Sequence, residues 1–118
     1  MISPSLEPET IFPGITRSSV IELARKELGM EVIEQIVTLN DLQEGTEAFC
    51  CGTGASITPV ASVTTDNPDG TTDMAVFGDG KEPGPTTRRL YEILQAIQTG
   101  SDPDLSQKYA HWIHTVCP

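Results

Sequence analysis

Two short segments of the sequence carry residue types that hold an anion. In Pro13-Gly14-Ile15-Thr16-Arg17, backbone N–H groups and the Thr16 hydroxyl would lie at the positive end of a helix. In Gly52-Thr53-Gly54, small residues let a ligand approach backbone N–H groups, and Thr53 adds a hydroxyl. Each segment also has a commoner structural interpretation: a helix cap at Thr16, and a tight bend between two strands at the glycines. Neither segment establishes an anion site by itself.

The cysteines and histidines favour neither a disulfide framework nor a metal site. Cys50 and Cys51 are adjacent and Cys117 lies near the C-terminus, a spacing that does not suit zinc. A bond between neighbouring cysteines would be strained, so we expect free thiols, a reducing compartment, and Cys50 as a small buried residue. His111 and His114 lack a Cys or acidic partner at metal-site spacing. No metal ligand is therefore assigned.

The acidic composition disfavours anionic macromolecules as binding partners. The chain has 118 residues, with 17 acidic residues against 7 Lys plus Arg and a formal net charge of -10. A field of that sign repels phosphate backbones and anionic lipid, which disfavours nucleic acid and membrane surfaces as partners. The apolar runs are shorter than the ~18 residues of a membrane span, and no signal or transit peptide is visible. The sequence predicts a cytoplasmic protein or leaves its compartment open.

The first half of the chain predicts two helical elements around a strand. Ile21, Ala24 and Leu28 recur at helical spacing, so we expect a helix over 17–28 that Thr16 caps and Gly29 ends. The next elements are a strand over 31–39 with Ile33, Val37 and Leu39 on one face, and a short helical turn that Asn40 and Gln43 cap and that ends near Gly45.

The second half predicts extended segments followed by one strong helix. Two extended segments cover 47–51 and 56–63, with a bend at Pro59, and turn residues 66–70 join Val63 to a strand over 74–77 in a hairpin. After a loop over 78–85, an amphipathic helix carries Leu90, Ile93, Leu94 and Ile97, is capped near Thr86 or Thr87, and ends at Gly100. A polar tail holds Trp112, Ile113 and Val116 as a last strand.

The anion-binding candidates belong to a longer ordered set of motifs. The set comprises Thr10-Ile11-Phe12-Pro13-Gly14-Ile15-Thr16-Arg17, Glu47-Ala48-Phe49-Cys50-Cys51-Gly52-Thr53-Gly54 with Pro59-Val60, Gly84-Pro85, and Ile97-Gln98-Thr99-Gly100 with Trp112. In this order the chain resembles the C-terminal portion of branched-chain amino acid aminotransferases, which are fold type IV pyridoxal-phosphate enzymes. The second motif is similar to the family's E-x-F-x-x-G-T-A loop, with Gly54 in place of the usual Ala.

The resemblance implies site residues and a reaction. Ile15 and Thr16 would bind the phosphate of pyridoxal 5′-phosphate, with Gly52 and Thr53 completing the phosphate site. Thr53 and Gly54 would bind the substrate carboxylate. The parent reaction transfers an amino group between leucine, isoleucine or valine and 2-oxoglutarate, so the partners are small amino and 2-oxo acids, and the resemblance allows a homodimer.

The resemblance also implies that reactive groups of the family are missing. The lysine that holds the cofactor as a Schiff base precedes the Pro-Gly-Ile-Thr segment in the family, whereas this chain has no lysine there. Lys26, Lys81 and Lys108 match no catalytic position, so no catalytic residue is assigned. We expect little or no activity from the chain alone.

The expected fold is α/β, an incomplete large domain of fold type IV in which strands of a barrel-like sheet carry two main outer helices. Residues 1–9 are expected to be a disordered or extended segment, and 10–118 the partial C-terminal domain. Two alternatives stay open: a non-catalytic fragment that acts as a binding or interaction module, and another fold type IV enzyme, either a D-amino acid aminotransferase or an aminodeoxychorismate lyase.

Overall fold

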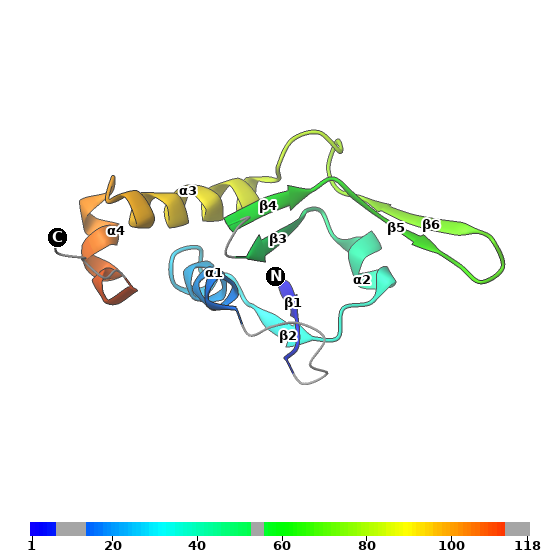
Figure 1. Cartoon of the computed structure of the whole chain (residues 1–118), viewed down its shortest axis with the longest axis horizontal. Coiled ribbons are helices and arrows are strands. Elements are labelled where there is room, and N and C mark those ends of the chain that lie inside the picture. Colours follow the sequence, from blue (N-terminus) through cyan, green and yellow to red (C-terminus); the bar gives the residue numbers. More distant parts are fainter. Residues whose placement is uncertain (7–13, 53–55, 113–118) are drawn as a thin grey trace.

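The computed structural model describes residues 1–6, 14–52 and 56–112 of the chain. Its elements are β1 (Ile2–Pro4), α1 (Ile15–Lys26), β2 (Ile33–Gln35), α2 (Leu39–Glu44), β3 (Ala48–Gly52), β4 (Ser56–Val60), β5 (Ser62–Asp66), β6 (Thr72–Val76), α3 (Pro85–Thr99), α4 (Pro103–Lys108) and the 3-10 helix η1 (Ala110–Trp112) (Figure 1). The expected α/β class is confirmed. Within these ranges, no helix is long and apolar enough to cross a membrane.

The hydrophobic core lies where α1 and α3 pack against the β3–β4 hairpin. The stripe expected on the second main helix is confirmed, because its apolar positions, three and four residues apart, are all buried. The buried core residues are Val20, Ile21, Leu23, Ala24, Val32, Ile57, Leu90, Ile93, Leu94, Ile97 and Tyr109. This core fixes α1 and α3 relative to β3, the strand that ends at the expected glycine loop.

The strands pair as three two-stranded ribbons. β1 and β2 are parallel, whereas β3–β4 and β5–β6 are antiparallel hairpins. In the part of the chain that the structure describes, no ribbon pairs with another to make a wider sheet. The described residues therefore form separate pieces of sheet rather than a closed one.

The strand expected over 31–39 is wrong in length, because β2 has only 3 residues. The strand is as long as its only partner in the described part of the chain, the three residues of β1, and a helix cap follows at Thr38. The Thr38 hydroxyl accepts a hydrogen bond from the Asp41 N–H at 3.2 Å, and the Asp41 carboxylate accepts one from the Thr38 N–H at 2.9 Å. This reciprocal pair starts α2 one residue after Thr38, so the expected capping pair of Asn40 and Gln43 is also wrong.

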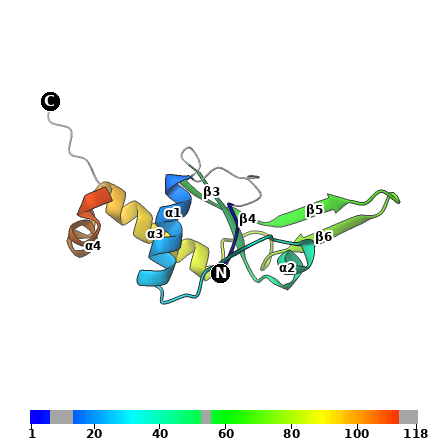
Figure 2. The same cartoon turned by 90° about the horizontal axis from the view of Figure 1, so that it is seen from below.

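The β5–β6 hairpin confirms the turn expected at 66–70. Register runs from Ser62 opposite Val76 to Asp66 opposite Thr72. Pro59 does not bend the chain as expected, because β4 continues through it to Val60. Both views show the hairpin extending away from α1 and α3 (Figures 1 and 2), and α2 contacts β6 near its base.

The C-terminal region contains a helix, α4, where a polar tail was expected. Asp102 caps it by accepting hydrogen bonds from the N–H groups of Asp104 and Leu105, both at 3.1 Å. Behind it, the Tyr109 hydroxyl donates to Glu27 at the end of α1 at 2.8 Å. Trp112 lies in η1, so a last strand beginning there is wrong. Ile113 and Val116 lie outside the described residues.

Candidate functional site

The first turn of α1 is the candidate anion site that the structure describes. Gly14 precedes the helix with φ −67° and ψ 144°, and no side-chain hydrogen bond caps it among the described residues. The helix therefore begins at Ile15, and Thr16 lies within the first turn, so its expected role as the cap is wrong. The helix ladder begins with the bond from the Ser18 N–H to the Gly14 carbonyl, 3.1 Å long. The N–H groups of Ile15 and Thr16 precede this bond and have no helix carbonyl to bind.

This turn combines a positive helix end with access from solvent. Ile15 is 86% exposed, although it is a large aliphatic residue, and Thr16 is half-buried. Helix N-termini favour negative charge because the unpaired N–H groups carry the positive end of the helix dipole. The geometry fits a phosphate group at Ile15 and Thr16.

Arg17 connects the first turn of α1 to the β1–β2 ribbon. Its guanidinium donates to the Pro4 carbonyl at 2.8 Å and to the Glu34 carboxylate at 2.6 Å. The Arg17 side chain is only 12% exposed, and its Nε is buried without a partner in the described part of the chain. The residue thus joins α1 to both strands of the β1–β2 ribbon. No sequence pattern predicts this contact, because nothing local links positions 17 and 34.

The carboxyl end of β3 lies beside the start of α1. The two elements are in contact, and both views show the first turn of α1 next to the end of β3 (Figures 1 and 2). Gly52 is the last residue of β3 and faces Ser56 across the hairpin. Ser56 has a positive φ of 54°, an uncommon conformation for a residue other than glycine. The structure thus places the first turn of α1 near the end of β3, whereas Thr53 and Gly54 lie outside the described residues.

Cys50 and Cys51 point to opposite sides of β3, as the alternation of a strand requires. Cys50 is exposed, so its expected burial is wrong; Cys51 instead packs against the core. Burial raises the pKa of the Cys51 thiol, and the nearby positive charge of Arg17 opposes that shift less strongly. This electrostatic coupling supports the proximity of the first turn of α1 to the end of β3. Both thiols are free.

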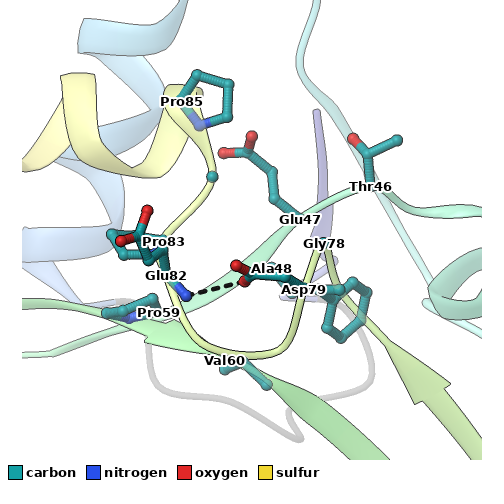
Figure 3. A pocket seen from close by; sticks show the side chains of 12 residues that line it. Thr46, Glu47, Ala48, Pro59, Val60, Gly78, Asp79, Glu82, Pro83 and Pro85 are labelled. Atoms are coloured by element: carbon teal, nitrogen blue, oxygen red, sulfur yellow. Dashed lines mark hydrogen bonds between the residues drawn. The ribbon is translucent and has the colours of Figure 1, made fainter.

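A cavity of about 370 Å³ lies at the opposite end of the β3–β4 hairpin (Figure 3). It is lined by Thr46, Glu47, Ala48, Pro59, Val60, Phe77, Gly78, Asp79, Glu82, Pro83, Gly84 and Pro85. Asp79 accepts hydrogen bonds from the N–H groups of Glu82 at 3.0 Å and Lys81 at 2.9 Å, which hold the pKa of its carboxyl below the ordinary value. Acidic side chains and bonds already made within the loop make this cavity a poor anion site.

Glu47, which lines that cavity, binds the first turn of α3 with its carboxylate. Its carboxylate accepts hydrogen bonds from the Thr87 N–H at 2.6 Å, the Thr87 hydroxyl at 2.8 Å and the Thr86 N–H at 3.3 Å. The expected cap at Thr86 or Thr87 is therefore wrong: Gly84 holds the cap position and the capping carboxylate comes from 40 residues away. Arg88 and Arg89 next to this turn are exposed.

None of the three lysines of the sequence lies in the first turn of α1 or at the end of β3. Lys26 is near the far end of α1 and pairs with Glu22. Lys81 is exposed in the loop before α3, and Lys108 pairs with Glu27 at 2.6 Å.

The histidines do not form a metal site in the described region. His111 is exposed and lies near Tyr109, with ring centroids 6.4 Å apart, and His114 is outside the described ranges. Among the residues that the structure describes, no group of three or more His, Cys, Asp or Glu side chains is placed to hold a metal ion.

Comparison with known proteins relates this geometry to one family. Residues 1–63 match the family model described as amino-transferase class IV. The chain is 42% identical over 92 residues to a branched-chain-amino-acid aminotransferase of Haemophilus influenzae, covering 78% of this chain and 25% of that protein. It is 44% identical over 95 residues to the mitochondrial branched-chain-amino-acid aminotransferase 1 of Arabidopsis thaliana, covering 80% and 23%.

Solved structures give the same relation. The branched-chain amino acid aminotransferase of Escherichia coli superposes with a TM-score of 0.65 at 38% identity, covering 81% of this chain and 28% of that one. The Thermobaculum terrenum enzyme in its PLP-form gives 0.66 at 34% identity, covering 88% and 30%. The chain spans about a quarter of the length of the curated relatives described above.

Proposed function

The chain belongs to the amino-transferase class IV family, and we propose that it forms the part of a branched-chain amino acid aminotransferase that holds the phosphate of pyridoxal 5′-phosphate. The parent reaction would transfer an amino group between leucine, isoleucine or valine and 2-oxoglutarate. Relatives and solved structures that carry the branched-chain aminotransferase name support this choice, at identities of 42% and 38% respectively.

The observation that carries the proposal is the open first turn of α1. In a chain of net charge -10, an anion needs concentrated local donors rather than overall attraction. We assign the backbone N–H groups of Ile15 and Thr16 and the Thr16 hydroxyl to the phosphate. Gly52 and Thr53 complete this assignment on the resemblance described above, and Thr53 and Gly54 take the substrate carboxylate on the same basis.

The contribution of these residues is to bind and to orient. When bound, pyridoxal phosphate supplies the electron sink for amino transfer. Ile15 and Thr16 would fix the phosphate end, and the buried Arg17 would hold the turn against β1 and β2 through Pro4 and Glu34.

We further propose that the chain alone does not turn over leucine. Amino transfer by this cofactor needs an amine beside it, and the lysines lie elsewhere in the chain, paired with Glu22 and Glu27 or exposed in the loop before α3. Borohydride reduction with pyridoxal phosphate and peptide mapping would contradict this if one stoichiometric adduct at Lys81 accompanied leucine turnover.

The wider setting follows from the same assignment. The substrates of the parent enzyme would be a small amino acid and a 2-oxo acid. We propose a homodimer for the parent enzyme only, and not for this chain alone. The free thiols of Cys50 and Cys51 favour a reducing compartment such as the cytoplasm.

Binding of pyridoxamine 5′-phosphate tests the phosphate site. This probe lacks the aldehyde, so it cannot react with surface lysines, and pyridoxamine without the phosphate is the matched ligand. We expect Thr16→Val to lower the affinity for pyridoxamine 5′-phosphate about tenfold, because one hydrogen bond to a charged group is lost. Equilibrium dialysis measures the affinity.

Thr86→Val is the matched control, because Thr86 lies in the first turn of α3, which Glu47 already fills. It should change the affinity less than about twofold. Equal losses in the two variants, or equal binding of the probe with and without phosphate, would reject the site.

A further inference from the structure

Arg17 lies where three parts of the fold meet. Its guanidinium donates from one nitrogen, Nη2, to the Pro4 carbonyl of β1 at 2.8 Å and to the Glu34 carboxylate of β2 at 2.6 Å. Its positive charge also opposes the rise in the pKa of the Cys51 thiol, which lies in β3. The backbone of Arg17 belongs to the first turn of α1. One side chain therefore relates this turn both to the β1–β2 ribbon and to β3.

The contacts of Arg17 suit a residue that fixes a position better than one that stabilises the fold. Its side chain is 12% exposed, and Nε is buried without a partner in the described part of the chain. A buried donor without a hydrogen bond costs free energy. Ion pairs taken out of water often add little net stability, and their best attested role is to select one arrangement of the elements that they join.

The guanidinium contacts the ribbon, whereas the N–H groups assigned to the phosphate lie one turn earlier on the same helix. The N–H groups of Ile15 and Thr16 precede the first bond of the helix ladder, from Ser18 to Gly14. Hydrogen bonds weaken steeply as their angle departs from linear. A tilt of the first turn would therefore weaken the bonds from these two N–H groups to an anion.

We propose that Arg17 is a positioning residue for the phosphate of the cofactor. Held by Glu34 and the Pro4 carbonyl, it fixes the direction of the Ile15 and Thr16 N–H groups without touching the phosphate itself. The inference rests on the proposed function of this turn, and it adds the side chains that determine how tightly the turn binds.

Equilibrium dialysis with pyridoxamine 5′-phosphate is the first test, and pyridoxamine is the ligand without phosphate. We expect Arg17→Gln to lower the affinity for the phosphorylated ligand about tenfold and to change that for pyridoxamine less than about twofold. Both bonds of Arg17 come from one nitrogen, so the ammonium of Arg17→Lys should restore the affinity to within about threefold of the unsubstituted chain. A lysine variant that binds no better than the glutamine variant would overturn the proposal.

Arg25→Gln is the matched control. Arg25 lies in the last turn of the same helix and donates to the Val32 carbonyl at 3.0 Å, so the substitution removes the same kind of contact at the other end of α1. It should change the affinity for pyridoxamine 5′-phosphate less than about twofold. Equal losses in the two glutamine variants would show that Arg17 acts only through the stability of α1, and would overturn the proposal.

Glu34→Gln tests whether the ribbon transmits the effect. We expect it to lower the affinity about threefold in the unsubstituted chain and less than about 1.5-fold in Arg17→Gln, because the glutamate acts only through the arginine. Removing a negative charge would by itself favour an anion in both backgrounds. An increase in affinity, or equal changes in the two backgrounds, would overturn the proposal.

Hydrogen exchange without ligand separates this inference from the phosphate site. The Ser18 N–H bonds to the Gly14 carbonyl at 3.1 Å, and the Glu27 N–H bonds to the Leu23 carbonyl at 2.8 Å at the other end of α1. Arg17→Gln should speed exchange of the Ser18 amide at least about fivefold and change that of Glu27 less than about twofold. Unchanged exchange at Ser18 would overturn the positioning role even if phosphate binds. Faster exchange there, in a chain that does not distinguish the two ligands, would reject the proposed function and confirm only that Arg17 orders the turn.

Discussion

The starts of α1 and α3 look alike in sequence and differ in what surrounds them. Each helix follows a glycine in extended conformation, and neither glycine supplies a side-chain cap. At α3, the Glu47 carboxylate occupies the first turn, bound to Thr87 and Thr86. At α1, the described residues place no carboxylate on the first turn, and Glu34 binds the Arg17 side chain instead. One helix start is closed by the protein's own carboxylate, and at the other the described residues place none.

The largest expected effect on stability comes from substituting Gly84, the glycine that precedes α3. An added Cβ at Gly84 would lie 2.3 Å from Oε2 and 2.6 Å from Cβ of Glu47, so the capping side chain must move. We expect Gly84→Ala to lower the free energy of unfolding by about 3 kcal/mol, combining overpacking with lost charged hydrogen bonds. Urea unfolding measures the loss.

Gly14→Ala is the matched substitution at α1. An added Cβ there meets nothing within 4 Å, so the change should stay within about 0.5 kcal/mol. Similar losses at both glycines would show that the two helix starts are equally crowded, which would remove the contrast.

The two glutamates provide the second comparison. Glu47→Gln keeps the shape of the cap but removes its charge, and we expect a loss of about 2 kcal/mol because the group is partly buried and bound to backbone N–H groups. Glu34→Gln should cost less than about 1 kcal/mol, since Glu34 is 40% exposed. Thermal unfolding compares the variants; a larger loss at Glu34 would reverse the ranking.

The far end of α1 gives a smaller, pH-dependent effect. Hydrogen bonds from Lys108 and Tyr109 hold the pKa of Glu27 below its ordinary value. A pKa that is lower in the folded state contributes stability above the unfolded value, and this contribution disappears as the pH falls through the folded value. We expect Glu27→Gln to flatten the decline of unfolding free energy between about pH 5 and pH 3. An unchanged acid slope would contradict a stabilising role for this contact.

The smallest effect is a difference in labelling rate between the two thiols of β3, which involves no change in stability. In a Cys117→Ser background, Cys50 should react at least about tenfold faster than Cys51, which is packed against the core and whose pKa burial raises. Mass spectrometry of labelled peptides gives both rates. Equal rates would show that Cys51 is not packed against the core, and would contradict the contact between β3 and α1.

Local sequence patterns predicted much of the fold. The stripe of Leu90, Ile93 and Ile97 needs only helical spacing, and the 66–70 turn needs only its own backbone preferences. The helix predicted over 17–28 overlaps the observed α1 for the same reason. At 31–39 the β-branched residues predicted a longer strand than the three residues that pair with β1, and the Thr38–Asp41 cap starts a helix at Leu39.

Tertiary structure decided which groups meet. Glu47 reaches Thr87 across 40 positions, and the Tyr109 hydroxyl reaches Glu27 across 82. No periodicity encodes such pairs, because they depend on how α1 and α3 pack on the β3–β4 hairpin. By itself the sequence determined helices, turns and an ordered set of motifs, since these depend on neighbours along the chain. Only the packed molecule decided that a distant carboxylate, Glu47, caps the start of α3, because distances in space arise from the shared core.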